Sequence, residues 1–306
     1  MPRRAFPLLA LAIALAVALA WGRPGLAAES CAPRLRAALN VGPGGVPLAT
    51  LSINGGTAHL MLDTGAERTT LTETAARRLG LIADFDHAQT MRGVGGNIVA
   101  GEVRPDLGAP GGRVLPGVAF AVVPVEFPAV DDQPVDGLLG ADMLSAYDLD
   151  LDLGHHLILL YDPPACPNAA LPWRRGYATV EGQVSRHRHV AFPILLDGQH
   201  LRAFIDTGAQ VSLLDAAASH RLGVTATALE ADAALLMQGV STQVVTARQH
   251  RFARLEMAEA VLLTPLVAVM PLRLDDADML LGTDLLARQR IWLSYAGRRI
   301  FVARPE

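Results

Sequence analysis

The sequence predicts an all-β protein, mainly strands with a few short helices, built as two homologous lobes related by a pseudo-two-fold axis. Residues 53–81 align without a gap with residues 196–224, and each copy contains the tripeptide Asp-Thr-Gly. Short β-type segments bounded by turn-forming residues recur through both halves of the chain. An internal repeat of this length indicates two copies of one structural unit.

The repeat extends beyond this first block. The stretch around Gly93 corresponds to the stretch around Gly239, and each half later carries two leucines followed by a glycine, Gly140 or Gly282. These two glycines lie 77 and 76 residues after the aspartate of their own tripeptide. The predicted division of the chain is a signal peptide at 1–28, an N-terminal lobe at 29–165, a Pro-rich linker at 166–180 and a C-terminal lobe at 181–306.

Both lobes are expected to consist mostly of strands. Asn54-Gly55 and Asp197-Gly198 are typical of two-residue hairpin turns. Five short segments bounded by Gly, Pro, Asn or Asp are expected to be strands: residues 59–62, 118–124, 157–161, 201–205 and 300–303.

Two short helices are expected in each lobe. The first follows each Asp-Thr-Gly tripeptide, over residues 73–79 and 215–222, and ends at a glycine. The second should begin just after each Leu-Leu-Gly, with Asp142 or Asp284 near its N-terminus. A carboxylate suits that position because the first N–H groups of a helix have no partner within the helix.

Composition and the N-terminus narrow the possible functions. The chain is 51% hydrophobic and 18% charged with a net charge of −4, which indicates a sizeable core and argues against a nucleic-acid partner. Arg3 and Arg4 precede an apolar run over residues 5–21, followed by Ala27 and Ala28. This pattern predicts a cleaved secretory signal, with an uncleaved membrane anchor as the alternative. The protein is therefore expected to be exported, periplasmic or secreted, with no membrane span after signal cleavage.

Export affects the interpretation of the two cysteines, Cys31 and Cys166. In an oxidising compartment an even number of cysteines favours a disulfide between them. Two buried free thiols are the alternative.

Two Asp-Thr-Gly loops can together form one catalytic site. Gly65 and Gly208 allow the backbone to turn sharply and to bring its N–H groups close to a carboxylate. If the lobes pair, Asp63 and Asp206 face each other, and two carboxylates in close contact share one proton. The ionised carboxylate can then take a proton from water while its partner hydrogen-bonds a substrate carbonyl. That is general acid–base hydrolysis of an amide, for which no cofactor is expected.

With these motifs the chain resembles an aspartic peptidase of the pepsin and retropepsin kind, nearest to bacterial retropepsin-like proteins. The resemblance implies the acid-protease fold with two retropepsin-like β-barrel lobes, and it implies that Asp63 and Asp206 are the catalytic dyad. It further implies that Thr64 and Thr207 lock the two loops together by hydrogen bonds. The other residues that it assigns are Gly65, Ala66, Gly208 and Ala209 in the loops; Leu138, Leu139, Gly140, Leu280, Leu281 and Gly282 in the Leu-Leu-Gly motifs; and Gly93, Val94, Gly95 and Gly96 in a flap over the substrate, with Gly239 at the equivalent place in the second lobe.

Two features depart from the pepsin pattern. Ala66 and Ala209 stand where pepsins usually carry Ser or Thr, and no tyrosine lies between Gly93 and Gly101. The arrangement is thus bilobal like a pepsin, while the local motifs resemble retroviral enzymes. Whether one flap or two operate stays open.

The expected function is that of an exported aspartic endopeptidase acting on a peptide or unfolded protein substrate, as a monomer whose lobes pair within the chain. One alternative is a peptide-binding or regulatory module that has the same fold without turnover. Another is a homodimer in which each lobe pairs with its equivalent in a second chain.

The histidines are not expected to bind metal. His187 and His189 favour a solvated loop or an edge strand, because no third ligand is suitably placed in the sequence. His155 and His156 are expected at a hairpin turn of the first lobe, again without a metal.

Overall fold

The computed structural model describes residues 33–42, 45–93, 96–108, 118–163, 170–174, 176–239, 243–272, 274 and 276–304. The expected signal peptide at 1–28 and the expected Cys31–Cys166 disulfide lie outside these ranges. Within them, no helix combines the length and the apolar character needed to cross a membrane.

The first lobe is built on an eight-stranded sheet with the order β5-β6-β8-β4-β9-β3-β2-β7. Most of its pairs are antiparallel, but β3 and β9 run parallel, as do β4 and β8. The strands are β2 (Leu48–Ile53), β3 (Gly56–Leu62), β4 (Thr70–Thr72), β5 (Asp84–Gly93), β6 (Gly96–Val103), β7 (Leu107–Gly108), β8 (Phe120–Val123) and β9 (Gly137–Leu139).

The second lobe repeats this arrangement in a ten-stranded sheet with the order β17-β18-β21-β16-β22-β15-β14-β19-β20, to which β13 adds beside β14. The parallel pairs recur as β15 with β22 and β16 with β21. The strands are β13 (Gln183–Val184), β14 (Val190–Leu196), β15 (Gln199–Ile205), β16 (Leu213–Asp215), β17 (Ala233–Gln238), β18 (Val244–Arg251), β19 (Arg254–Met257), β20 (Ala260–Leu263), β21 (Leu266–Met270) and β22 (Met279–Leu281).

The predicted fold class, mainly β with short helices in two similar lobes, is confirmed. The expected β-barrels are not closed among the described strands, because each lobe's sheet has two ends, β5 and β7 in the first lobe and β17 and β20 in the second. The hairpin turns form as predicted: Asn54 and Asp197 both have φ 49°, and the glycine after each has φ 77°. Such left-handed pairs match the twist of the flanking strands.

The helices are short and lie where the repeat predicts them. The first of each lobe is α1 (Glu73–Arg78) or α3 (Ala216–Arg221), and the second, directly after Leu-Leu-Gly, is α2 (Ala141–Leu144) or α5 (Thr283–Leu286). Thr72 caps α1 by accepting a hydrogen bond from the backbone N–H of Ala75. The helix α4 (Ala226–Ala231) was not anticipated, because the corresponding part of the first lobe lies in β5 and the repeat therefore does not mark it.

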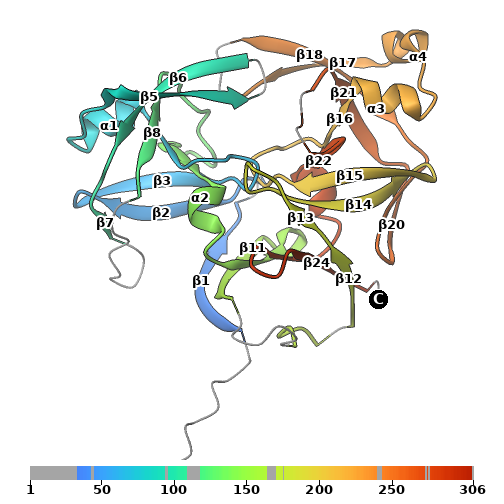
Figure 1. Cartoon of the computed structure of the whole chain (residues 1–306), viewed down its shortest axis with the longest axis horizontal. Coiled ribbons are helices and arrows are strands. Elements are labelled where there is room, and N and C mark those ends of the chain that lie inside the picture. Colours follow the sequence, from blue (N-terminus) through green and yellow to red (C-terminus); the bar gives the residue numbers. More distant parts are fainter. Residues whose placement is uncertain are drawn as a thin grey trace, which may run out of the picture. The chain divides into compact units, whose positions relative to one another are not determined.

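A third sheet joins the two lobes. It has six strands in the order β1-β11-β10-β23-β24-β12, and its central pair, β10 with β23, comes from different lobes. Four of these strands, β1, β11, β24 and β12, are labelled in the lower half of Figure 1. The strands are β1 (Arg34–Asn40), β10 (Asp148–Asp152), β11 (Leu157–Asp162), β12 (Tyr177–Glu181), β23 (Ile291–Ser294) and β24 (Arg299–Ala303). β12 begins inside the stretch expected to be a linker. On this sheet the fully buried Asp150 accepts hydrogen bonds of 2.9 and 2.7 Å from Arg290 of the other lobe.

Candidate active site

The first Asp-Thr-Gly loop begins where β3 ends. Parallel pairing with β9 places Asp63 beside the Leu-Leu-Gly motif, and the backbone N–H of Asp63 donates to the carbonyl of Leu139 at 3.0 Å. One carboxylate oxygen of Asp63, Oδ1, then accepts the backbone N–H groups of Gly65 and Ala66, each at 2.9 Å. The loop thus offers two donors to one oxygen, an arrangement that favours an ionised carboxylate.

The second loop repeats this geometry almost bond for bond. The N–H of Asp206 donates to the carbonyl of Leu281 at 2.9 Å, at the end of β15 beside β22. Asp206 Oδ1 accepts the N–H groups of Gly208 and Ala209 at 3.0 and 3.1 Å. The two aspartates are therefore held by the same kind of backbone cradle.

The structure brings the two loops together through Thr64 and Thr207, both of which are buried. The N–H of each threonine donates to the hydroxyl of the other at 3.1 Å. Each hydroxyl in turn donates across the interface at 2.7 Å, from Thr64 to the carbonyl of Ile205 and from Thr207 to the carbonyl of Leu62. These four bonds join residues 141 to 145 positions apart within one chain.

The carboxyl groups of Asp63 and Asp206 are hydrogen-bonded to each other. Each loop glycine packs against the opposite carboxyl: a Cβ added at Gly65 would lie 2.3 Å from Asp206 Cγ, and one at Gly208 would lie 2.3 Å from Asp63 Cγ. A residue with a side chain at either position would push the pair apart. Glycine is therefore required here by close approach and not by an unusual φ.

Burial and mutual repulsion make this pair hold a proton. Burial raises the pKa of Asp63, while the N–H of Ala66 and the bond to Asp206 oppose that rise. The pKa of Asp206 lies well above its ordinary value, because of burial first and the charge of Asp63 second. Two acids in contact do not both ionise. The pair therefore holds one proton and one negative charge.

The Leu-Leu-Gly motifs support the loops from behind. Gly140 and Gly282 lie so close to the backbone after each catalytic loop that an added Cβ would come within 2.5 Å of Arg68 C and 2.7 Å of Val211 C. Leu138 and Leu280, in the same motifs, are buried. The backbone of the motif therefore packs directly against the segment after the loop, and a residue larger than glycine does not fit at Gly140 or Gly282.

Asp142 and Asp284 do more than begin a helix. Asp142 Oδ1 accepts the N–H and hydroxyl of Thr69 at 2.9 and 2.6 Å, and Asp284 Oδ1 accepts the same two groups of Ser212 at 3.0 and 2.7 Å. Each carboxylate therefore ties its helix to the segment after the catalytic loop. The repeat could have suggested this role, since Thr69 and Ser212 occupy corresponding positions.

Two hairpins, β5–β6 and β17–β18, carry the expected flap residues at their tips. Gly93 pairs with Gly96 at the end of the first hairpin, and Gly239 follows β17 in the second. A Cβ added at Gly96 would lie 3.7 Å from Gln243 Oε1, so the two tips approach each other, as Figure 1 shows at the top of the view. Val94 and Gly95 lie outside the described residues.

The segment between β13 and β14 is a turn with exposed residues, as expected for a solvated loop or an edge strand, but His187 and His189 are only half exposed. His189 Nε2 lies 2.9 Å from the carbonyl oxygen of Gly65, and its ring stacks on Phe204 with centroids 4.3 Å apart and planes 10° apart. His187 Nδ1 lies 2.8 Å from Glu67 Oε2. A loop of the second lobe therefore packs on the catalytic loop of the first, a contact that spacing along the sequence could not reveal.

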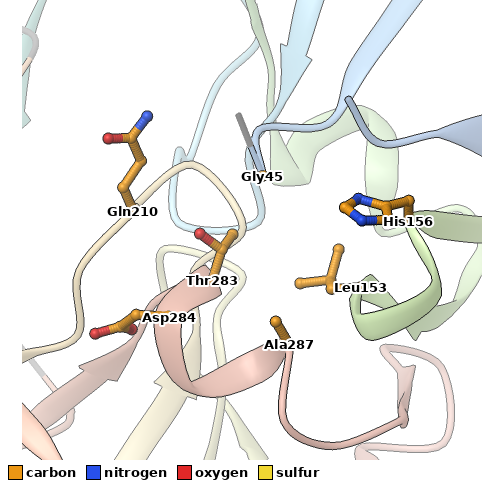
Figure 2. Close-up of a pocket in the computed structure, with 7 residues that line it drawn as sticks. All are labelled: Gly45, Leu153, His156, Gln210, Thr283, Asp284 and Ala287. Atoms are coloured by element: carbon orange, nitrogen blue, oxygen red, sulfur yellow. The ribbon is translucent and has the colours of Figure 1, made fainter. Parts of the chain in front are cut away.

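Two cavities lie at corresponding places beside the two catalytic loops. The cavity beside the Asp206 loop has a volume of about 230 Å³ and is lined by Gly45, Leu153, His156, Gln210, Thr283, Asp284 and Ala287 (Figure 2). The cavity beside the Asp63 loop has a volume of about 360 Å³ and is lined by Glu67, Arg68, Gln89, Val118, Ala119, Asp142 and Arg188. Across the described ranges, no group of three or more His, Cys, Asp or Glu side chains is arranged to hold a metal ion.

Comparisons with known proteins agree with this geometry. The model of a family described as aspartyl protease matches residues 49–143 and again 192–285, and each segment contains one Asp-Thr-Gly loop. Protein DDI1 homolog 2 from Danio rerio is 29% identical over 110 residues, which are 35% of this chain and 25% of that protein, so the match spans a quarter of the relative's length.

Two solved structures are also similar. Basic 7S globulin from soybean superposes with a TM-score of 0.46 at 11% identity, over 89% of this chain and 95% of that chain. A retropepsin-like aspartic protease from Rickettsia conorii superposes with a TM-score of 0.34 at 15% identity, over 43% of this chain and 96% of that chain.

Proposed function

We propose that this chain, which belongs to the retropepsin-like aspartyl protease family, is an exported endopeptidase that hydrolyses peptide bonds by activating a water between Asp63 and Asp206. The observation that carries the proposal is the hydrogen-bonded pair of carboxyl groups, each held by two backbone N–H groups and joined through the Thr64–Thr207 lock. A module that only binds peptides has no need for two matched carboxylates sharing one proton.

The proposed reaction begins with Asp63 ionised and Asp206 protonated. The Asp63 carboxylate removes a proton from a water, whose oxygen attacks the carbonyl carbon of the peptide bond. Asp206 gives its proton to the carbonyl oxygen, which forms a neutral tetrahedral intermediate with two hydroxyl groups. Asp63 then passes its proton to the amide nitrogen while Asp206 takes one back from a hydroxyl, and the carbon–nitrogen bond breaks. The pair ends with the single proton with which it began.

The two hairpins support an extended peptide as the substrate. Each carries partly buried apolar side chains near its tip, Met91 and Ile98 on β5–β6 and Met237 and Val245 on β17–β18. Closure of both tips over the pair would shield a peptide bound below them from water. We therefore propose that both hairpins act as flaps over a peptide or an unfolded protein segment.

Export is part of the proposal and rests on the sequence. The basic residues Arg3 and Arg4, the apolar run over 5–21 and the small residues at Ala27 and Ala28 support a cleaved signal and a periplasmic or secreted enzyme. Edman or mass-spectrometric determination of the N-terminus of the protein recovered from outside the cytoplasm tests it.

The test of function is cleavage of a denatured protein by the purified chain between pH 3 and pH 7, with and without a statine-type inhibitor. We expect cleavage that the inhibitor blocks, and mass spectrometry of the products should locate internal cut sites. Tight inhibitor binding without any cleavage would instead identify a peptide-binding module with the same fold.

A further inference from the structure

The two lobes differ at the segment that precedes their first core strand. In the repeat, His189 corresponds to Val46, which lies before β2 and is buried. An isopropyl group cannot form a hydrogen bond, whereas an imidazole can. The first lobe therefore has a purely apolar contact at the place where the second lobe has a polar ring.

His189 contacts the first Asp-Thr-Gly loop at Gly65 and the strand that leads into the second loop at Phe204. Its Nε2 lies 2.9 Å from the carbonyl oxygen of Gly65, and its ring stacks on Phe204 at the end of β15. A carbonyl oxygen only accepts, so Nε2 carries the hydrogen of this bond. The loop that holds His189 is itself braced, since the N–H groups of His187 and His189 donate to Ser185 Oγ at 3.1 and 3.2 Å.

The carbonyl that His189 binds is half of a peptide group that also acts on Asp63. The Gly65 carbonyl and the Ala66 N–H belong to the same amide, and this N–H donates to Asp63 Oδ1 at 2.9 Å. A donor on the oxygen of an amide polarises the group and strengthens the bond that its N–H makes. The chain of bonds thus runs from His189 through one peptide group to the catalytic carboxylate.

We propose that His189 is a positioning residue that strengthens the hydrogen bond between the Ala66 N–H and Asp63 and so helps to keep the negative charge of the pair on Asp63. The proposal rests on the proposed function, because it names the residue that distinguishes two otherwise matched aspartates. In the first lobe the position that corresponds to His189 is occupied by Val46, which cannot donate a hydrogen bond to the peptide group between Gly208 and Ala209.

One titratable neighbour of His189 is His187. The ring of His187 lies 6.3 Å away between centroids, and His187 is held by Glu67 on one side and by Arg186 on the other. On the other face the neighbour is Phe204, which is uncharged. The hydrogen bonds connect the imidazole to Asp63 through the peptide group between Gly65 and Ala66.

Three variants test this route. His189→Phe keeps an aromatic ring over Phe204 but has no donor, His189→Gln keeps a donor, and His187→Gln alters the same loop without touching the Gly65 carbonyl. Loss of the donor weakens the support of ionised Asp63, so the pKa of Asp63 rises. We expect the acid limb of kcat/KM against pH to move up by about 0.1–0.7 pH unit in His189→Phe and to stay in place in the two glutamine variants. His189→Val, which copies the first lobe, replaces His189→Phe if the latter does not fold.

A second measurement does not depend on turnover. In an Asp206→Asn background Asp63 titrates alone, and its carboxyl carbon can be followed by NMR with and without His189→Phe. A shift of the titration to higher pH supports the relay even if the wild-type chain cleaves nothing, in which case only the protease proposal falls. A folded His189→Phe protein with an unchanged Asp63 titration overturns the relay, whether or not the wild type is active.

Discussion

The surroundings of the two catalytic loops differ far more than the loops themselves. Beside Asp63 the cavity is lined by Glu67, Arg68 and Arg188, and beside Asp206 the corresponding cavity has Gln210 and Gly45 in its lining. The backbone donors are nearly the same, at 2.9 Å to Asp63 and 3.0 and 3.1 Å to Asp206. The two loops are thus matched in their backbone donors and differ in the side chains that surround them.

Some features of the site are present in both lobes, and others are present in only one. Each lobe supplies one carboxylate, two N–H donors to that carboxylate and one threonine of the lock. The proposed reaction needs both an acid and a base, and each of them needs this support. The His187–His189 segment occurs once. It lies on the side of Asp63, the residue that carries the negative charge in the proposed mechanism.

Replacing either aspartate by asparagine should have the largest effect on activity, and an equal one in the two lobes. Asp63→Asn and Asp206→Asn each remove the shared-proton state, so each should reduce turnover by at least about 1,000-fold. The double variant should be little worse than either single one, because the pair acts as a unit. Kinetics on a fluorogenic peptide measure this, with circular dichroism to show that the fold is kept. Near wild-type turnover in one single variant would exclude the two-carboxylate mechanism.

Removing one threonine hydroxyl should have the largest effect on stability. In Thr64→Ala, the N–H of Thr207 and the carbonyl of Ile205 lose their buried partners, which should lower the free energy of unfolding by about 2–4 kcal/mol. Thr207→Ala should cost the same within about 1 kcal/mol, since its bonds mirror those of Thr64. Denaturant unfolding measures both, and Thr64→Ser is the matched control that keeps the hydroxyl. Clearly unequal losses would show that the lock is not symmetric.

Serine in place of the loop alanines should move the pH profile, and unequally. A hydroxyl at residue 66 can donate to ionised Asp63, which lowers its pKa and extends the acid limb to lower pH. Ala66→Ser should shift that limb down by at most about one to two pH units, and Ala209→Ser by less, because the proposed mechanism starts with the proton on Asp206. Initial rates from pH 2 to pH 7 decide it. An acid limb that does not move in an active Ala66→Ser protein means that burial alone sets the pKa.

The smallest expected effect concerns Asp284, which ties α5 to Ser212 in the second lobe. Burial raises the pKa of Asp284 in the folded state, so its contribution to stability is complete at low pH and is lost as the pH rises through that raised pKa. Asp284→Asn keeps an oxygen acceptor but does not ionise. Its free energy of unfolding should therefore fall less than that of the wild type between pH 4 and pH 7, by less than the effect of Thr64→Ala. Parallel curves for the two proteins would contradict this.

The sequence predicted the parts of the molecule that belong to the internal repeat. The strands, the paired helices and the two aspartates follow from the repeat, because a motif in two equivalent contexts excludes chance. The contact of His189 with Gly65 was not predicted, since it joins residues from different lobes and the repeat breaks at that point. That break was the available signal: the residues before β14 are polar where those before β2 are small and apolar.

The third sheet, between the lobes, was also beyond sequence reasoning. Its central strands β10 and β23 come from different lobes, and the composition of either strand does not predict with which strand it pairs. The burial of Asp150 against Arg290 illustrates the difficulty. An alternating run of Asp and Leu suggests a half-exposed strand, yet Asp150 is fully buried because the partner lobe supplies a bidentate cation.

The six-stranded sheet has a consequence for the order in which the chain is synthesised and folds. Asp148 of β10 pairs with Ser294 of β23, so this sheet cannot form until the strands of the second lobe have been synthesised. Pairings between distant positions also form slowly, because a long stretch of chain must be closed before they are made. A nascent polypeptide that has emerged only as far as the first lobe carries Asp63 and no counterpart. Under the proposed function, pairing of the carboxylates within one chain therefore has to follow the folding of the second lobe against the first.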